Sequence, residues 1–85
     1  MTRNPFRRET GVRFALAAQT SVTLDIFDVS GRRVTRLSDE SLSAGEHTVN
    51  WDGRDAAGRT LPAGLYLYRL NAGRETAEGK IMRMR

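Results

Sequence analysis

The sequence predicts a small all-β domain, an antiparallel sandwich of about six or seven short strands. Apolar and polar residues alternate with a period of two over much of the chain, and turn-forming residues recur at roughly ten-residue spacing. The length of 85 residues is sufficient for one domain with a modest core. No stretch shows the periodicity and end caps of a helix. A five-stranded barrel is the structural alternative.

The expected strands are separated by turn residues. They cover 11–17, 21–28, 32–37, 46–51, 65–70 and about 75–84. In the third of them, Val34 and Leu37 fall on opposite parities, which predicts a bulge or a strand end there. Residues 38–45 are polar and rich in turn formers, so we expect a turn region between the third and fourth strands.

The run at 65–70 is the most strand-like of the chain. Tyr66, Tyr68 and Leu70 share one face. Leu65 and Leu67 share the other, which is also apolar. This pattern predicts either a central strand covered on both sides or a strand with one face in a contact.

The charges are interspersed. Fourteen Lys and Arg against ten Asp and Glu give a net charge of +4. Because the basic residues are scattered among acidic ones, they indicate a solvated surface, and we expect no nucleic-acid partner. No apolar stretch approaches the roughly 18–20 residues that span a bilayer, so no membrane span is expected.

The residues for catalysis are sparse. His47 is the only histidine and there is no cysteine, which excludes a Cys–His pair and a thiolate metal site. The chain has no nucleophile-elbow motif, so we expect that it is not an enzyme and that it binds no cofactor. The loop Asp52–Gly58 suggests calcium, but its oxygens are too few, and Arg54 and Arg59 compete for the carboxylates. We therefore expect no metal, and a loop held by its Asp side chains.

Two aromatic residues indicate how the sandwich is held together. Tyr66 follows the turn Pro62-Ala63-Gly64 and opens a strand, as the buried tyrosine of a tyrosine corner does. Trp51 ends a strand just before a loop, and we expect it to be the largest anchor of the core.

An ordered series of motifs carries a resemblance over about Asn4 to Arg85. Its first part is Asn4-Pro5-Phe6, Thr10, Val12, Phe14, Leu16, Val22 to Asp28 and Gly31 to Val34. Its second part is Gly45, His47, Trp51, Asp52, Gly53, Arg54, Asp55, Gly58, Gly64, Tyr66 and Lys80. This series resembles the immunoglobulin-like domain shared by FlgD flagellar hook-capping proteins and the C-terminal sorting domains of type IX secretion substrates.

The resemblance implies an immunoglobulin-like (fibronectin type III-like) antiparallel β-sandwich of about seven strands, without catalysis. We expect residues 1–85 to form a single domain, with 1–9 as a loosely ordered lead-in. The expected state of the isolated domain is a monomer.

The opening Asn-Pro-Phe and the basic tail favour the sorting role. In that role the domain targets a secreted bacterial parent protein to the cell surface, and its partners are the outer-membrane secretion machinery and a sortase. The expected recognition strand is Lys80, Ile81, Met82, Arg83, Met84 and Arg85. Met82 and Met84 depart from the β-branched residues usual in that family.

Two alternative roles remain open at this stage. One is a domain of a flagellar hook cap that contacts hook subunits. The other is a retained accessory sandwich of a secreted hydrolase. A carbohydrate ligand in that role requires exposed aromatic residues in a row.

Overall fold

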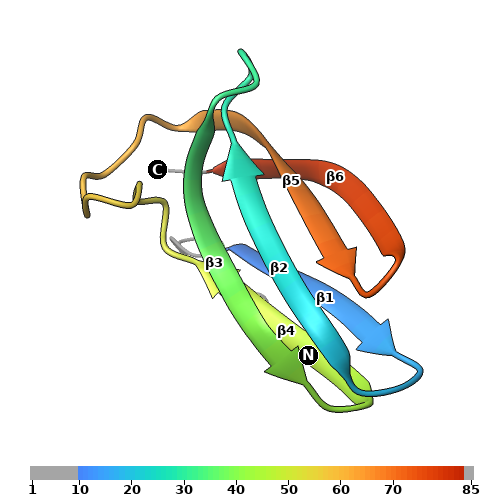
Figure 1. Cartoon of the computed structure of the whole chain (residues 1–85). Helices are drawn as coiled ribbons and strands as arrows, with labels where there is room; N and C mark the ends of the chain where they lie inside the picture. The colour runs from blue at the N-terminus through green and yellow to red at the C-terminus, as the bar shows by residue number, and fades with distance from the viewer. Residues whose placement is uncertain (1–9, 84–85) are drawn as a thin grey trace, which may run out of the picture.

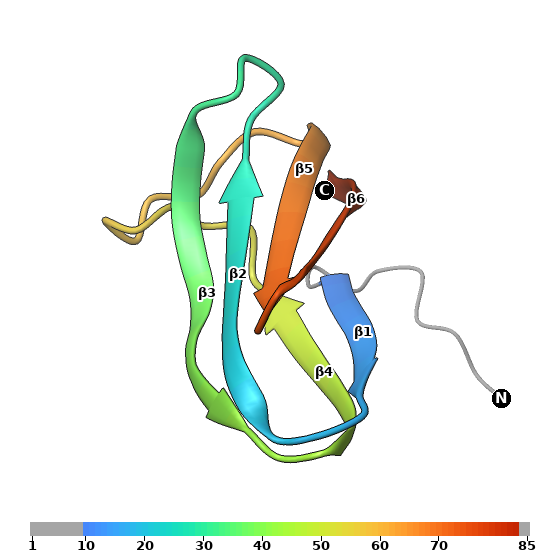
Figure 2. The same ribbon diagram turned by 45° about the vertical axis from the view of Figure 1, so that its right-hand side comes forward.

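The computed structural model describes residues 10–83, which form six strands in two antiparallel sheets (Figure 1). The strands are β1 (Thr10–Leu16), β2 (Thr20–Phe27), β3 (Arg33–Leu42), β4 (Gly45–Trp51), β5 (Gly64–Ala72) and β6 (Glu75–Arg83). One sheet pairs β1 with β4, and the other has the order β3-β2-β5-β6 (Figure 2). This is the predicted immunoglobulin-like sandwich, with six strands in the described part where about seven were expected.

The third strand is longer than predicted. β3 runs to Leu42 through the segment expected to be a turn region, and pairs with β2 as far as Thr20. β3 is an edge strand, so solvent covers much of it and its polar composition is compatible with a strand. The chain instead reverses within the two residues between Leu42 and Gly45.

The predicted irregularity in β3 is present as two shifts of register against β2. They leave Leu37 and Val34 without a direct partner on β2. Each extra residue changes the parity of the strand. Val34 is therefore buried in the core and Leu37 packs against it, although alternation alone would put them on opposite faces.

The core lies between the inner faces of the two sheets. Its ten buried hydrophobic residues are Val12, Leu16, Val22, Leu24, Ile26, Val34, Trp51, Tyr66, Leu70 and Ile81. Trp51 is 1% exposed, and its ring meets that of Tyr66 edge-on, with centroids 5.0 Å apart. Its indole N–H donates to the carbonyl of Arg54 at 3.0 Å, which ties the end of β4 to the following loop.

Candidate binding surface

The loop after β4 is held by two carboxylates. Asp52 Oδ1 accepts from the backbone N–H of Arg54 at 3.1 Å. Asp55 Oδ1 accepts from the backbone N–H groups of Ala57 and Arg59, and its Oδ2 accepts from Arg59 Nε at 3.1 Å. The Arg59 backbone N–H is the main cause that holds the pKa of Asp55 below its usual value. These carboxylates accept hydrogen bonds from the loop's own backbone N–H groups, so the Asp side chains hold the loop.

Gly53 and Gly58 give this loop its shape, with φ angles of +82° and +87°. Gly53 is buried, and the side chain of Arg83 from β6 lies against it so closely that a Cβ there would overlap Arg83 Nε. This contact joins the loop to the last strand. A Cβ on Gly58 would meet no neighbouring atom, so only the backbone angle favours glycine at this position.

Tyr66 is anchored in the way the sequence predicts for a tyrosine corner. Its hydroxyl donates to the carbonyl of Pro62 at 2.7 Å, four residues upstream. Gly64 lies between them with a φ of +143°. The motif residues of the loop and of the start of β5 therefore hold the fold and present no convergent reactive groups.

The expected recognition strand is only partly accessible. Lys80 is exposed and Met82 is 54% exposed, but Ile81 is 3% exposed and belongs to the core. Arg83 is half-buried against Gly53. Met84 and Arg85 lie outside the described residues. β6 thus presents alternate side chains to solvent and uses the others for packing.

The accessible side chains of β6 belong to a surface that we call the outer face, the side of the four-stranded sheet turned away from the core. Its apolar part consists of Phe27, Leu65, Leu67 and Met82, of which Leu65 is 38% exposed. Leu65 lies opposite Met82, and Leu67 lies between Phe27 and Lys80 in the ladder. No described strand covers the face of β5 that is opposite the core, so the first interpretation of the 65–70 pattern, a central strand covered on both sides, does not hold.

Charged side chains border this apolar part. Arg69 Nε donates to Glu78 at 2.9 Å, and its guanidinium carbon lies 5.1 Å from the ring centre of Phe27. Phe27, Leu67, Arg69, Glu78 and Lys80 line a shallow hollow of about 360 Å³. Apolar centre and charged border together are typical of protein-binding surfaces.

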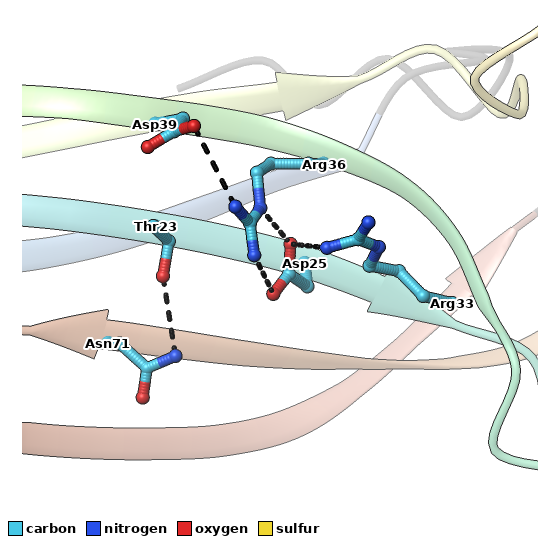
Figure 3. A network of polar contacts seen from close by, with 6 residues as sticks. All are labelled: Thr23, Asp25, Arg33, Arg36, Asp39 and Asn71. Atoms are coloured by element: carbon cyan, nitrogen blue, oxygen red, sulfur yellow. Dashed lines mark hydrogen bonds and ion pairs between the residues drawn. The ribbon is translucent and has the colours of Figure 1, made fainter.

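The polar half of the outer face is a network that sequence reasoning missed (Figure 3). Asp25 is 5% exposed and receives a bidentate pair of bonds from Arg36, at 2.7 and 3.2 Å. Arg33 lies 3.7 Å from the same carboxylate. The hydrogen bond to Asp25 raises the pKa of Arg36. Alternation placed Asp25 on the polar face, but only the bulged register brings Arg36 opposite it.

Within residues 10–83 no three His, Cys, Asp or Glu side chains are grouped to hold a metal ion. The described part of the chain also contains no helix that is long and apolar enough to cross a membrane. His47 stacks on Phe14, with ring centroids 5.6 Å apart, and its Nε2 lies 2.8 Å from the carbonyl of Ser43. Its position in the fold is therefore explained by packing.

The fold and the outer face define an immunoglobulin-like sandwich with an open sheet face. The chain belongs to the FlgD Ig-like domain family, whose model matches residues 6–76. The basal-body rod modification proteins FlgD of Salmonella typhimurium (strain LT2) and Salmonella typhi are each 47% identical to it over 45 residues. That match covers 53% of this chain and 19% of each relative.

Solved structures agree with this assignment. FlgD from Xanthomonas campestris, described in terms of the hook capping essential for flagellar assembly, has a TM-score of 0.68 and 29% identity. FlgD from P. aeruginosa has a TM-score of 0.69 and 23% identity, which shows the shared fold. Each match covers 87% of this chain, and 54% and 57% of the respective solved chains. The chain thus spans about half of these structures and a smaller part of the curated relatives.

These findings correct the functional prediction. The sequence favoured a type IX sorting module at the cell surface, but the matching family and relatives are FlgD proteins. The sorting role, its secretion-machinery and sortase partners and the cell-surface location are therefore wrong. The sorting role was favoured by the opening Asn4-Pro5-Phe6, which lies outside the described residues, and by the basic tail. The motifs that carry the resemblance mainly serve the fold, since Trp51, Gly53 and Tyr66 are all buried.

Proposed function

We propose that this chain is a non-catalytic, protein-binding domain of a FlgD-type flagellar hook-assembly protein and that it contacts hook subunits. The observation that carries the proposal is the FlgD Ig-like family match over residues 6–76. It is supported by the Xanthomonas relative, whose description concerns hook capping. Fold-level likeness alone does not fix a function, so the proposal also needs a surface suited to a protein partner.

The outer face is the surface that we assign to this contact. Met82 and Leu65 are large apolar side chains that the fold leaves exposed beside each other on neighbouring strands. Exposed apolar groups in a charged border are favourable in a protein contact, because water is removed from them on binding. Lys80 and the Arg69–Glu78 pair then give the contact its orientation.

The test is an in-frame deletion of residues 10–83 from the parent protein in its source organism. We expect cells that fail to build hooks, because a cap without its binding domain does not retain subunits at the growing end. The surface is tested with Met82→Glu, which should reproduce part of the defect. Ala57→Glu adds the same charge on an exposed loop residue and should leave hooks normal. Normal hooks in the deletion strain would overturn the proposal.

A further inference from the structure

The two sheets of the sandwich differ in width, and the narrower one leaves part of the wider one uncovered. Four strands face only two. The consequence appears along β6, where alternate positions from Glu75 to Arg83 lie on the inner side. Ile81 is buried, Gly79 is half-buried, and Ala77, opposite the buried Leu70, is exposed. Cover from the second sheet therefore ends before the first half of β6.

A groove occupies the uncovered place. It has a volume of about 490 Å³ and lies between the second half of β1 and the β5–β6 hairpin. Its lining is dominated by small and apolar side chains, including Phe14, Leu16, Leu70 and Ala77. Among residues 10–83, β1 and β6 each pair with one strand only, so each has one edge without a partner in this part of the chain, and they contact each other only slightly. The groove is thus bounded by the free edge of a strand and by an uncovered inner face.

The edge of β1 lacks the features that protect sheet edges from pairing. Such edges usually carry charges, prolines or bulges. β3 has two register shifts and several charged side chains, and β6 carries Glu75, Glu78, Lys80 and Arg83. β1 has one charge, Arg13, and pairs with β4 without a register shift from Thr10 to Leu16.

The other edge of the same sheet is different. β4 likewise has few charged residues and pairs with β1 without a register shift. However, Val34 and Ser38 of β3, the inner-side residues next to the edge of β4, are buried. An added strand would find no uncovered face there. Of the four edges that the described strands leave unpaired, β1 alone combines an unprotected edge with an uncovered inner face.

We infer that the free edge of β1 is a strand-addition site, where an extended segment of a partner protein pairs with β1 and completes a three-stranded sheet over Ala77 and Gly79. Main-chain hydrogen bonds supply affinity in this mode, and alternate side chains supply specificity. Side chains on the inner side of the added strand would be apolar, because they meet Phe14 and Ala77. The site is separate from the outer face, so it does not depend on what the outer face contacts.

Charge defines the other side of the partner segment. The Arg13 side chain is 78% exposed, and its one ion pair within the described residues, to Glu46, is long at 3.9 Å. An acidic residue on the solvent side of an added strand would lie beside Arg13 and pair with it. The partner is therefore a segment that alternates apolar and acidic residues.

The test uses the full 85-residue chain and two synthetic probes, an acetylated nine-residue peptide of alternating valine and glutamate and its counterpart with lysine for glutamate. Amide hydrogen exchange and chemical shifts are measured by NMR. We expect the glutamate peptide to protect alternate β1 amides at least tenfold. We also expect it to bind at least tenfold more tightly than the lysine peptide.

Two variants of matched charge change identify the site. Arg13→Glu should reverse the preference between the peptides, because Arg13 is exposed and its replacement leaves the core intact. Arg54→Glu, the same change on an exposed residue of the loop after β4, should leave the preference unchanged. If both variants alter the preference between the peptides equally, that preference reflects net charge, and the proposed site at β1 is wrong.

Three further results would overturn the inference. One is that neither peptide binds, and another is that the shifts fall on β6 instead of β1. The third is that β1 amides are already protected without peptide. Sedimentation at several concentrations would then distinguish a second copy of the chain from residues before Thr10 as the occupant. Loss of this site together with intact hook-subunit binding would leave the proposed function standing.

Discussion

The ring of Tyr68 lies across the backbone of Gly79, its direct partner on the neighbouring strand. The two residues are paired in the β5–β6 ladder. A Cβ on Gly79 would lie 2.5 Å from the ring carbon Cε2 and 2.6 Å from the hydroxyl oxygen. The φ of Gly79 is not positive, so a backbone angle does not require glycine there. The close approach of the Tyr68 ring does require it.

Gly79→Ala should therefore destabilise the domain. We expect a loss of about 1–3 kcal/mol in the free energy of unfolding, the usual cost of an overpacked contact. Urea unfolding followed by Trp51 fluorescence measures it. In a Tyr68→Ala background the ring is absent, and the same glycine change should cost much less. Equal losses in both backgrounds would contradict the described contact.

The contact between Gly53 and Arg83 gives a second prediction. Gly53→Ala and Gly58→Ala both place a side chain at a φ above +80°, which costs about 1–2 kcal/mol. Gly53→Ala should lose more stability than Gly58→Ala, because its Cβ also meets Arg83, whereas a Cβ at position 58 would meet no atom within 4 Å. Thermal unfolding of the two variants compares them. Arg83→Ala should remove the excess, and an excess that persists would show that the clash is not its cause.

Acid stability should depend on Asp55. Its pKa is lowered in the folded state, so the ionised carboxylate stabilises the fold above the unfolded pKa of about 4. That stabilisation is lost as the pH falls through the lower folded pKa. Asp55→Asn should lower the midpoint of thermal unfolding at pH 7, and the difference should close as the pH falls below about 4 and through the lower folded pKa. Glu40→Gln on the exposed surface of β3 is the control, and a gap that is the same at all pH values would refute the role of ionisation.

The hydroxyl of Tyr66 should contribute measurably to stability. Tyr66→Phe removes the hydrogen bond to Pro62, and we expect a loss of about 0.5–1.5 kcal/mol in the free energy of unfolding. Tyr68→Phe is the matched control, because the Tyr68 hydroxyl has no hydrogen-bond partner among the described residues, and it should be nearly neutral. A Tyr66→Phe protein as stable as this control would show that the hydroxyl does not anchor the turn.

Much of the fold is predictable from the chain because inner-face residues must be apolar. In β2 the apolar residues Val22, Leu24 and Ile26 alternate with Thr23 and Asp25, and all three are buried in the core. The extent of β3 is not predictable in this way, since an edge strand in solvent needs no apolar pattern. The ion pair between the buried Asp25 and Arg36 is not predictable from the sequence either, because it depends on a bulge that only the paired strands define.

The function is harder to predict because the recognisable motifs serve the fold. Trp51, Gly53 and Tyr66 anchor a loop and a strand, and any domain with this architecture needs such anchors. Phe27 and Lys80 of the outer face belong to the motif series, and Met82 to the expected recognition strand. Only the structure shows that Met82 is exposed beside Leu65. The comparison with FlgD proteins, rather than any site motif, contradicts the sorting role that the sequence favoured.

The most direct test of the central claim is calorimetric titration of the purified chain with the purified hook subunit of the same organism. The account predicts saturable binding that Met82→Glu weakens at least tenfold and Ala57→Glu leaves unchanged. Absence of binding by the folded chain would contradict the assignment of this domain to hook-subunit contact. Equal weakening by both variants would contradict the outer face as the surface that makes it.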